Sequence, residues 1–321
     1  MTLVGREGVA EVSVLVPAKD EEENLPEFVR LCGEALAGQP YPCEVVIVND
    51  GSEDGTATVL ERLRSEHAFL RVVTHRTRQG IADALRSAAD AASGSVFVFY
   101  PADLQFLPSE IPDLVEPIRT GKADIVTGAK QGAYEKAFVS RVYNWLCRRL
   151  FGIRVTDLNA VKAYRRSLMD VVGSRPDWHR FMVVIGHTEG FRVTERAVTL
   201  LPRKAGVSKF GLARIPAGLL DLLSVWFQIR FGRRPMLFFG LSGGVLLLLG
   251  IATGIVAFVL RFGFGAGFRP LLYLVLMLVL SGLALFGVGF LGELSAGSRE
   301  EIRGLTRAVD RLAQDLERRQ P

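Results

Sequence analysis

The chain has 321 residues, of which 49% are hydrophobic and 23% charged, and its formal net charge is +5. This length allows two ordinary domains. The charge excess is modest and no aromatic residues alternate with basic ones, so we expect no nucleic acid partner. The three cysteines, Cys32, Cys43 and Cys147, lack zinc-ligand spacing and an even count. They indicate reduced thiols of a cytosolic domain rather than a disulfide framework.

Short β-rich runs alternate with helical patterns through the first 130 residues. Because runs of Val, Ile and Phe stand unbroken between helices, the pattern predicts an α/β fold with a mostly parallel sheet covered on both faces. Strands are expected at 12–17, 44–50, 70–75, 95–100 and 123–128, and helices at 22–37, 55–66, 81–93 and 108–119. Further strands are expected within 155–166 and 192–203.

Polar clusters follow three of the predicted strands: "PAKDEEEN" (17–24), "NDGSEDGT" (49–56) and "PADLQ" (101–105). Ligands of parallel sheets bind at the carboxyl ends of the strands, so these clusters predict a site at one sheet edge. Asp50 could accept hydrogen bonds from a base or a ribose. The alternative is that Asp50 and Ser52 only build the turn and cap the next helix.

Asp103 closes the apolar run "SVFVFY" and lies two residues after Pro101. Neither common phosphate loop, G-x-x-x-x-G-K-[ST] or G-x-G-x-x-G, occurs in the chain. A Mg²⁺ or Mn²⁺ ion bound to a diphosphate needs only one or two protein carboxylates. A metal site at Asp103 is therefore one interpretation of this strand end, and the alternative is a bare turn.

Two long uncharged runs, Met236 to Leu260 and Leu271 to Gly292, follow the α/β region. Each reaches the ~20 residues that a helix needs to cross a bilayer; the alternative is two buried helices of a soluble core. The first residues contain no apolar signal-peptide core, and arginines cluster before the first run and after the second. This asymmetry predicts a cell-membrane protein whose N-terminal domain and both termini are cytoplasmic.

Two amphipathic segments flank the apolar runs. The segment 213–229 has Leu, Trp and Phe at helical spacing, which predicts a helix in the membrane interface or, alternatively, a cap on the soluble domain. The tail 298–321 has an apolar seam spaced 3-4-3-4. It either pairs protomers in a homo-oligomer or lies on the catalytic domain or the membrane.

Several motifs together resemble the family 2 glycosyltransferases of GT-A fold, and within them the polyprenyl-phosphate branch. They are "VLVPAKDEEENLPEFV", "VVIVNDGSEDGT", "RQGIADALRSAA", "ADLQFLPSEIPDLV", "SRVYNWLCRRLFGIRVTDLNAVKAYRR" and "GVSKFGL". The resemblance covers residues 10–294. It implies a catalytic domain over 1–212, a juxtamembrane helix over 213–234, a two-helix transmembrane domain over 235–294 and a cytosolic tail helix over 295–321.

The resemblance assigns roles to individual residues. The nucleotide would contact Pro17, Ala18, Lys19, Glu21, Val48 and Asp50, and the metal and diphosphate would contact Ala102, Asp103 and Gln105. Phosphate contacts would come from Lys130, Arg141, Arg203, Ser208 and Lys209, and Asp157 occupies an acidic catalytic position. Four positions depart from the family pattern: Lys19-Asp20 replaces Tyr-Asn, Pro101 replaces the first Asp of D-A-D, Lys130 replaces Arg, and Ala160-Val161 replaces Gly-Phe.

The activity implied is inverting, metal-dependent transfer of a hexose from a nucleotide diphosphate sugar, of GDP-mannose or UDP-glucose type, to a polyprenyl phosphate. A polysaccharide synthase of the same superfamily is one alternative, although "DWHRF" (177–181) does not supply its Q-x-x-R-W motif. A non-catalytic membrane scaffold derived from such an enzyme is the other, and it is motivated by Pro101 and Lys19.

Overall fold

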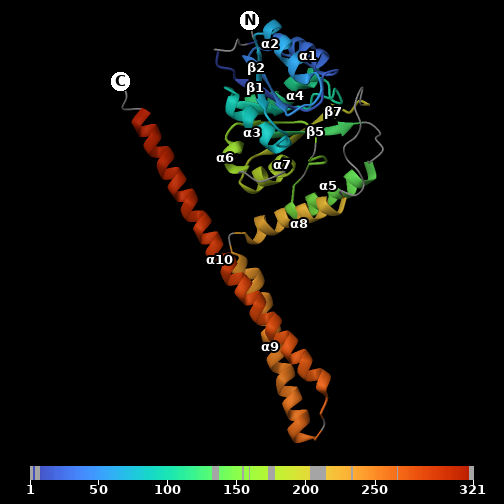
Figure 1. The fold of residues 1–321 in the computed structure, drawn as a ribbon, viewed down its shortest axis with the longest axis vertical. Coiled ribbons are helices and arrows are strands. Elements are labelled where there is room, and N and C mark those ends of the chain that lie inside the picture. The colour runs from blue at the N-terminus through green and yellow to red at the C-terminus, as the bar shows by residue number, and fades with distance from the viewer. Residues whose placement is uncertain are drawn as a thin grey trace. The chain divides into compact units, whose positions relative to one another are not determined.

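The computed structural model describes residues 3, 8–131, 137–153, 155–158, 160–172, 178–202, 215–232, 234–265 and 267–317. The chain divides into two compact units, Met1–Ala217 and Gly218–Pro321, and Figure 1 labels the elements of both. Each unit is described by itself below.

The first unit is built on a seven-stranded sheet of order β3-β2-β1-β4-β6-β5-β7. Its strands are β1 (Val12–Ala18), β2 (Cys43–Asp50), β3 (Leu70–His75), β4 (Val96–Phe99), β5 (Ile125–Gln131), β6 (Lys162–Arg165) and β7 (Val193–Thr199). All neighbouring pairs are parallel except those of β6, which runs antiparallel to β4 and β5. The expected mostly parallel sheet is confirmed.

The reversed direction of β6 has a consequence for the site. Antiparallel neighbours run in opposite directions, so the first residue of β6 lies beside the last residue of β4. Lys162 accordingly pairs with Phe99 at the end of β4 and with Thr127 of β5. The start of β6 therefore belongs to the same sheet edge as the carboxyl end of β4.

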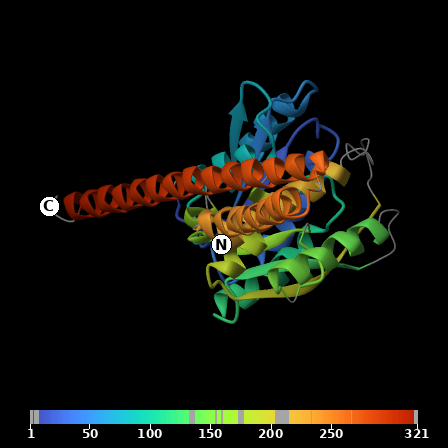
Figure 2. The same ribbon diagram turned by 90° about the horizontal axis from the view of Figure 1, so that it is seen from below.

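Helices cover both faces of the sheet, as Figures 1 and 2 show. Alternate residues of β1, such as Val14 and Val16, belong to the core that contains Phe28 of α1 and Leu114 of α4, and the residues between them point to the other face because the side-chain period of a strand is two. The helices are α1 (Leu25–Ala37), α2 (Thr56–Glu66), α3 (Ile81–Ala91), η1 (Pro108–Glu110), α4 (Ile111–Arg119), α5 (Ala137–Phe151), α6 (Leu168–Val172) and α7 (Trp178–Thr188).

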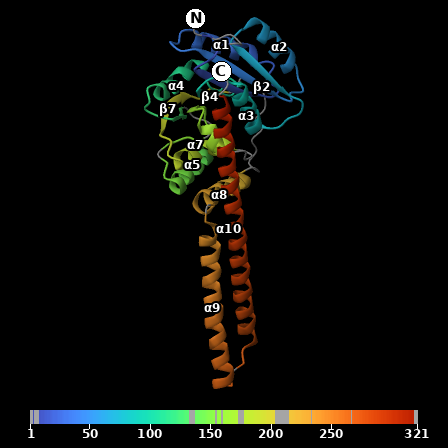
Figure 3. The same cartoon turned by 90° about the vertical axis from the view of Figure 1, so that its left-hand side faces the viewer.

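The second unit contains a hairpin of two long helices, α9 (Pro235–Gly263) and α10 (Arg269–Glu317), which run side by side in opposite directions (Figure 3). Both are long and apolar enough to cross a membrane, and only 11% and 6% of their most apolar windows are buried. Helices of a soluble core would be mostly buried, so this exposure favours membrane spans over the alternative. The helix α10 continues without a break into the tail, so the second apolar run and the tail form one helix.

Glycines let the two helices of the hairpin approach closely. A Cβ on Gly243 would lie 2.6 Å from the carbonyl oxygen of Gly282, and a Cβ on Gly282 would lie 2.8 Å from that of Gly243. Small residues at such crossings are typical of membrane helix pairs. Ahead of the hairpin, α8 (Ile215–Phe231) contains residues 215–229 of the segment predicted to be amphipathic.

Candidate functional site

The carboxyl ends of β1, β2 and β4 meet at one edge of the sheet, because β1 pairs in parallel with both of the others. Pro17 pairs with Val48 across β1 and β2, and Ala18 pairs with Asn49. Pro17 is partly exposed, whereas Ala18 and Val48 have 1% and 0% of their surface exposed. Ala18 and Val48 therefore support this edge from inside the sheet.

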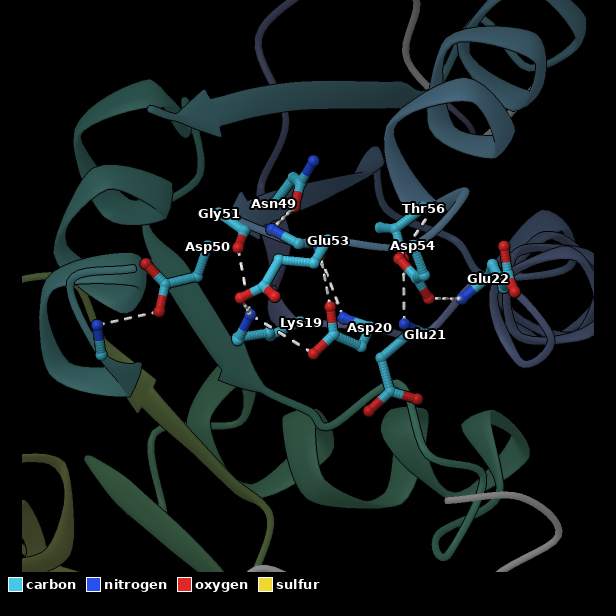
Figure 4. Close-up of polar contacts among 12 residues, drawn as sticks. Lys19, Asp20, Glu21, Glu22, Asn49, Asp50, Gly51, Glu53, Asp54 and Thr56 are labelled. Carbon is cyan, nitrogen blue, oxygen red and sulfur yellow. Dashed lines mark hydrogen bonds and ion pairs between the residues drawn. The ribbon is translucent and has the colours of Figure 1, made fainter. Parts of the chain in front are cut away.

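Lys19 links the loop after β1 to the loop after β2 (Figure 4). Its ammonium group donates to the carbonyl of Gly51 at 3.1 Å and lies 3.3 Å from the Asp20 carboxylate and 3.4 Å from the Glu53 carboxylate. Partial burial opposes its charge, but the two carboxylates outweigh burial and raise the pKa of Lys19. Lys19 thus stays charged and joins the two loops.

The neighbouring backbone strengthens the same link. The Asp20 amide donates to the Ser52 hydroxyl at 3.0 Å, and the Asp20 carboxylate accepts from the Glu53 amide at 2.9 Å. Asp20 has a φ of 56°, a left-handed conformation that short polar side chains tolerate. These contacts hold the loop after β1 and the loop after β2 in one arrangement.

Two glutamates complete this region. The Glu21 amide donates to the Thr56 hydroxyl at 2.9 Å, and its carboxylate accepts from Asn24 at 2.7 Å. The Glu22 carboxylate accepts from the Gly55 amide at 2.7 Å, at the start of α2. A carboxylate at that position stabilises the helix N-terminus.

Asp50 lies at the end of β2 and is 5% exposed. Its two oxygens accept from the amides of Gln79 and Gly80, each at 2.8 Å, and one lies 2.9 Å from Nδ1 of His75. Burial alone would raise the pKa of Asp50, but these hydrogen bonds prevail and lower it. Asp50 therefore stabilises the turn before α3, which is not the helix that the sequence alternative named.

Asp103 follows β4 in a tight turn and is 9% exposed. Its carboxylate accepts from the Gln105 amide at 3.3 Å, and the intervening Leu104 has a φ of 54°. The hydroxyl of Tyr100, a residue with no exposed surface, donates to the carbonyl of Leu107 at 2.6 Å. The turn that carries Asp103 and Gln105 is thus fixed from the core, with Ala102 buried inside it.

The donor set fits a divalent cation that arrives with a diphosphate. Within the described ranges, no group of three His, Cys, Asp or Glu residues is placed to hold a metal ion. Asp103 and Gln105 offer one carboxylate and one amide oxygen, which is sufficient when phosphate oxygens and waters complete the octahedron.

Lys130 and Asp157, both predicted from the sequence, lie together. The ammonium group of Lys130 on β5 is 3.3 Å from the Asp157 carboxylate, and their side chains are only 17% and 6% exposed. The Thr127 hydroxyl donates to the backbone carbonyl of Asp157 at 2.8 Å. The structure therefore joins the predicted phosphate contact to the predicted acidic residue.

The other predicted phosphate contacts fall outside the described residues or have side chains that do. Arg203, Ser208 and Lys209 lie outside the described residues, and so does the side chain of Arg141, whose backbone belongs to α5. The structure does show a contact two residues before Arg203. The Leu201 amide donates to the Gln105 carbonyl at 2.9 Å.

Sequence reasoning missed Lys162, which is 1% exposed at the start of β6. The available signal was a lysine inside the apolar stretch "AVKAY" (160–164), since a lysine is almost never buried unless it has partners. It also missed the exposed face of α5, where Trp145 is 57% exposed and Arg148 and Arg149 lie one helical turn away.

The arrangement is that of a GT-A-like glycosyltransferase. The glycosyl transferase family 2 domain matches residues 13–167. Dodecaprenyl-phosphate galacturonate synthase of Rhizobium johnstonii is 31% identical over 298 residues, which cover 89% of this chain and 88% of that protein. The chain belongs to glycosyltransferase family 2 and to its polyprenyl-phosphate branch.

A second curated relative agrees with this assignment, and a solved structure shares the fold. Undecaprenyl-phosphate 4-deoxy-4-formamido-L-arabinose transferase of Pseudomonas fluorescens is 28% identical, over 92% of this chain and 87% of the relative. Glucosyl-3-phosphoglycerate synthase from Mycobacterium tuberculosis, solved with Mn²⁺ and UDP, has a TM-score of 0.54 at 19% identity, over 68% of this chain and 80% of that one. This likeness confirms the fold.

Proposed function

We propose that the protein transfers a sugar from a nucleotide diphosphate donor to a polyprenyl phosphate, with inversion at the anomeric carbon. The observation that carries the proposal is the pairing of Lys130 with Asp157 at the sheet edge where the Asp103 turn follows β4. Charged groups that stabilise a leaving diphosphate and an incoming phosphate are needed at one place. The curated relatives are named for transfer to polyprenyl phosphates.

The donor would lie across the ends of β1, β2 and β4. Its base would enter between the loops that Lys19 joins, and its diphosphate would reach the Asp103 turn. Asp103 and Gln105 would hold Mg²⁺ or Mn²⁺, which when bound neutralises charge on the leaving diphosphate. Two structures of glucosyl-3-phosphoglycerate synthase, which has the same fold, hold Mn²⁺ or Mg²⁺ together with UDP.

The acceptor chemistry needs no strong general base. A phosphate monoester has a second pKa near 6 and is largely ionised at neutral pH, so its oxygen attacks directly. The protein must instead bring two anions together, the diphosphate of the donor and the phosphate of the acceptor. Lys130 does so in part, and Arg141, Arg203 and Lys209 are the other candidates.

Membrane attachment would place the lipid phosphate at the site. In α8, Leu219, Leu220 and Leu223 are exposed, which suits a helix that lies in the interface. The exposed Trp145, Arg148 and Arg149 of α5 suit an anionic lipid surface in the same way. With arginines flanking the two spans, the catalytic unit would face the cytoplasm.

One experiment identifies both the sugar and the nucleotide base of the donor. The purified full-length protein, in nanodiscs that contain undecaprenyl phosphate, is given radiolabelled UDP- and GDP-linked glucose and mannose, UDP-galacturonate and UDP-4-deoxy-4-formamido-L-arabinose. We expect one lipid-linked sugar that requires Mg²⁺ or Mn²⁺. Donor binding without transfer would favour the scaffold alternative, and a water-soluble polymer would favour the polysaccharide synthase.

A further inference from the structure

Lys162 is a charged side chain in the interior of the catalytic unit. It is 1% exposed, and its ammonium group donates to the carbonyls of Leu158 and His179, each at 3.0 Å. Burying an ammonium group is costly unless it is paired. One of its acceptors is the carbonyl of Leu158, the residue directly after Asp157. The buried ammonium group therefore lies beside the predicted site.

Three consecutive residues around Asp157 are each held by a different strand. Glu195 of β7 accepts from the Thr156 amide at 2.7 Å and from its hydroxyl at 2.9 Å. Thr127 of β5 donates to the carbonyl of Asp157. Lys162 of β6 donates to the carbonyl of Leu158.

The charges that face Lys162 come from three directions. Burial lowers the pKa of Lys162 to about 7, although Asp157 raises it and Lys130 lowers it further. On α7, burial and then Lys162 and Arg180 lower the pKa of His179 to about 3, so that imidazole is neutral. Among the hydrogen bonds to residues 156–158, the one to the Leu158 carbonyl comes from Lys162, a group that titrates near neutral pH.

We propose that Lys162 is a positioning residue for glycosyl transfer, which holds the 156–158 segment so that Asp157 keeps one orientation at Lys130. The inference rests on the proposed function and adds a residue to it. Lys162 touches backbone carbonyls and acts through Asp157.

The test compares Lys162→Met with Arg165→Met in the full-length protein in nanodiscs. Arg165 lies on the same strand but pairs with Asp124 at 3.0 Å. We expect Lys162→Met to lower kcat at least tenfold and to change the donor KM less than threefold, while Arg165→Met leaves kcat within twofold. Thr127→Val, which removes a second contact to the segment, should also lower kcat. Unchanged kcat in both Lys162→Met and Thr127→Val would overturn the proposal.

The pH profile separates positioning from a purely structural role. The protonated form of Lys162 exists below its pKa, so the kcat of the wild type should decline as the pH rises above about 7. Lys162→Arg stays charged, so its decline should begin at least one pH unit higher, whereas Thr127→Val should keep the wild-type profile. Identical profiles for the wild type and Lys162→Arg would overturn the proposal. A wild type without any transfer would instead overturn the proposed function, and this inference with it.

Discussion

The backbone carbonyl of Gln105 accepts a hydrogen bond from the amide of Leu201 at 2.9 Å. This contact ties the turn that carries Asp103 to the chain that leaves β7. Two residues later that chain reaches Arg203, the first of the predicted phosphate contacts in 203–209. A consecutive pair of residues spans at most about 7 Å. We therefore expect Arg203 to act on the same diphosphate as Asp103.

Replacing Asp103 by alanine should abolish transfer. The change removes the carboxylate at the predicted metal site. It also removes the acceptor of the hydrogen bond that the Gln105 amide donates within the turn. We expect kcat to fall at least a hundredfold and the Mn²⁺-dependent gain in nucleotide affinity to disappear in calorimetric titrations.

Asp113→Ala is the matched control, because Asp113 lies exposed on α4 ten residues away. It should retain activity within twofold. Wild-type turnover by Asp103→Ala, or full wild-type activity in excess EDTA, would show that no metal acts at this turn.

Asp50→Asn should destabilise the fold in a pH-dependent way. Asp50 has a lowered pKa because Gln79, Gly80 and His75 bond its carboxylate. Its stabilisation is therefore complete above the unfolded pKa of about 3.9 and is lost as the pH falls through the folded value. Near neutral pH we expect a loss of about 2 kcal/mol, typical of hydrogen bonds to a charged group. Denaturant unfolding from pH 7 to pH 3 should show the difference from wild type shrinking below about pH 4.

The central strands could be predicted because each is an apolar run that the sheet buries almost completely. β2, for example, is buried along its whole length. The partners of Asp50 could not be predicted, since they lie 29 and 30 residues along the chain and no local pattern links them. The burial of Lys162 depends on the antiparallel direction of β6, which follows from tertiary packing rather than from periodicity. The place of Asp103 shortly after β4, in contrast, is a local feature that the sequence predicts, and its role as a metal ligand stays a prediction.

Trp226→Glu tests the role of α8. Trp226 packs edge-to-face on Phe231, with the ring centroids 5.8 Å apart. A carboxylate there disfavours a helix that lies in the membrane interface. We expect transfer to undecaprenyl phosphate to fall at least tenfold while donor binding stays within twofold. The control Gln228→Glu adds the same charge at an exposed polar position and should have less effect. Equal loss of donor binding and transfer would indicate that α8 is a structural helix of the soluble domain.

Gly243→Ala tests the packing of the hairpin. The added Cβ would lie 2.6 Å from the carbonyl oxygen of Gly282, which belongs to a rigid helix backbone. Such overpacking costs about 1–3 kcal/mol. The adjacent Gly244→Ala is the control, because its Cβ would meet nothing within 4 Å. Thermal unfolding in detergent should show a lower midpoint for Gly243→Ala alone. Equal midpoints for the two variants would argue against close helix contact at this glycine.

Pro101→Asp restores the carboxylate that the family pattern places two residues before Asp103. A second negative charge within a few ångströms of a divalent ion adds attraction, although the diphosphate opposes it in part. If the site is a working metal site with one carboxylate, the Mn²⁺ concentration for half-maximal activity should fall several-fold.

Proline also fixes φ and lacks an amide hydrogen, so its loss could loosen the turn that orients Asp103. Pro101→Ala is therefore measured beside Pro101→Asp, since it removes the ring without adding charge. A lower maximal rate in both variants, with an unchanged Mn²⁺ requirement, would show that Pro101 serves the backbone. A lower Mn²⁺ requirement in Pro101→Asp alone would show that charge is what this position lacks. The added charge should raise the transfer rate and the loss of the proline ring should lower it. The metal titration distinguishes the two effects because only the added carboxylate changes the affinity for the ion.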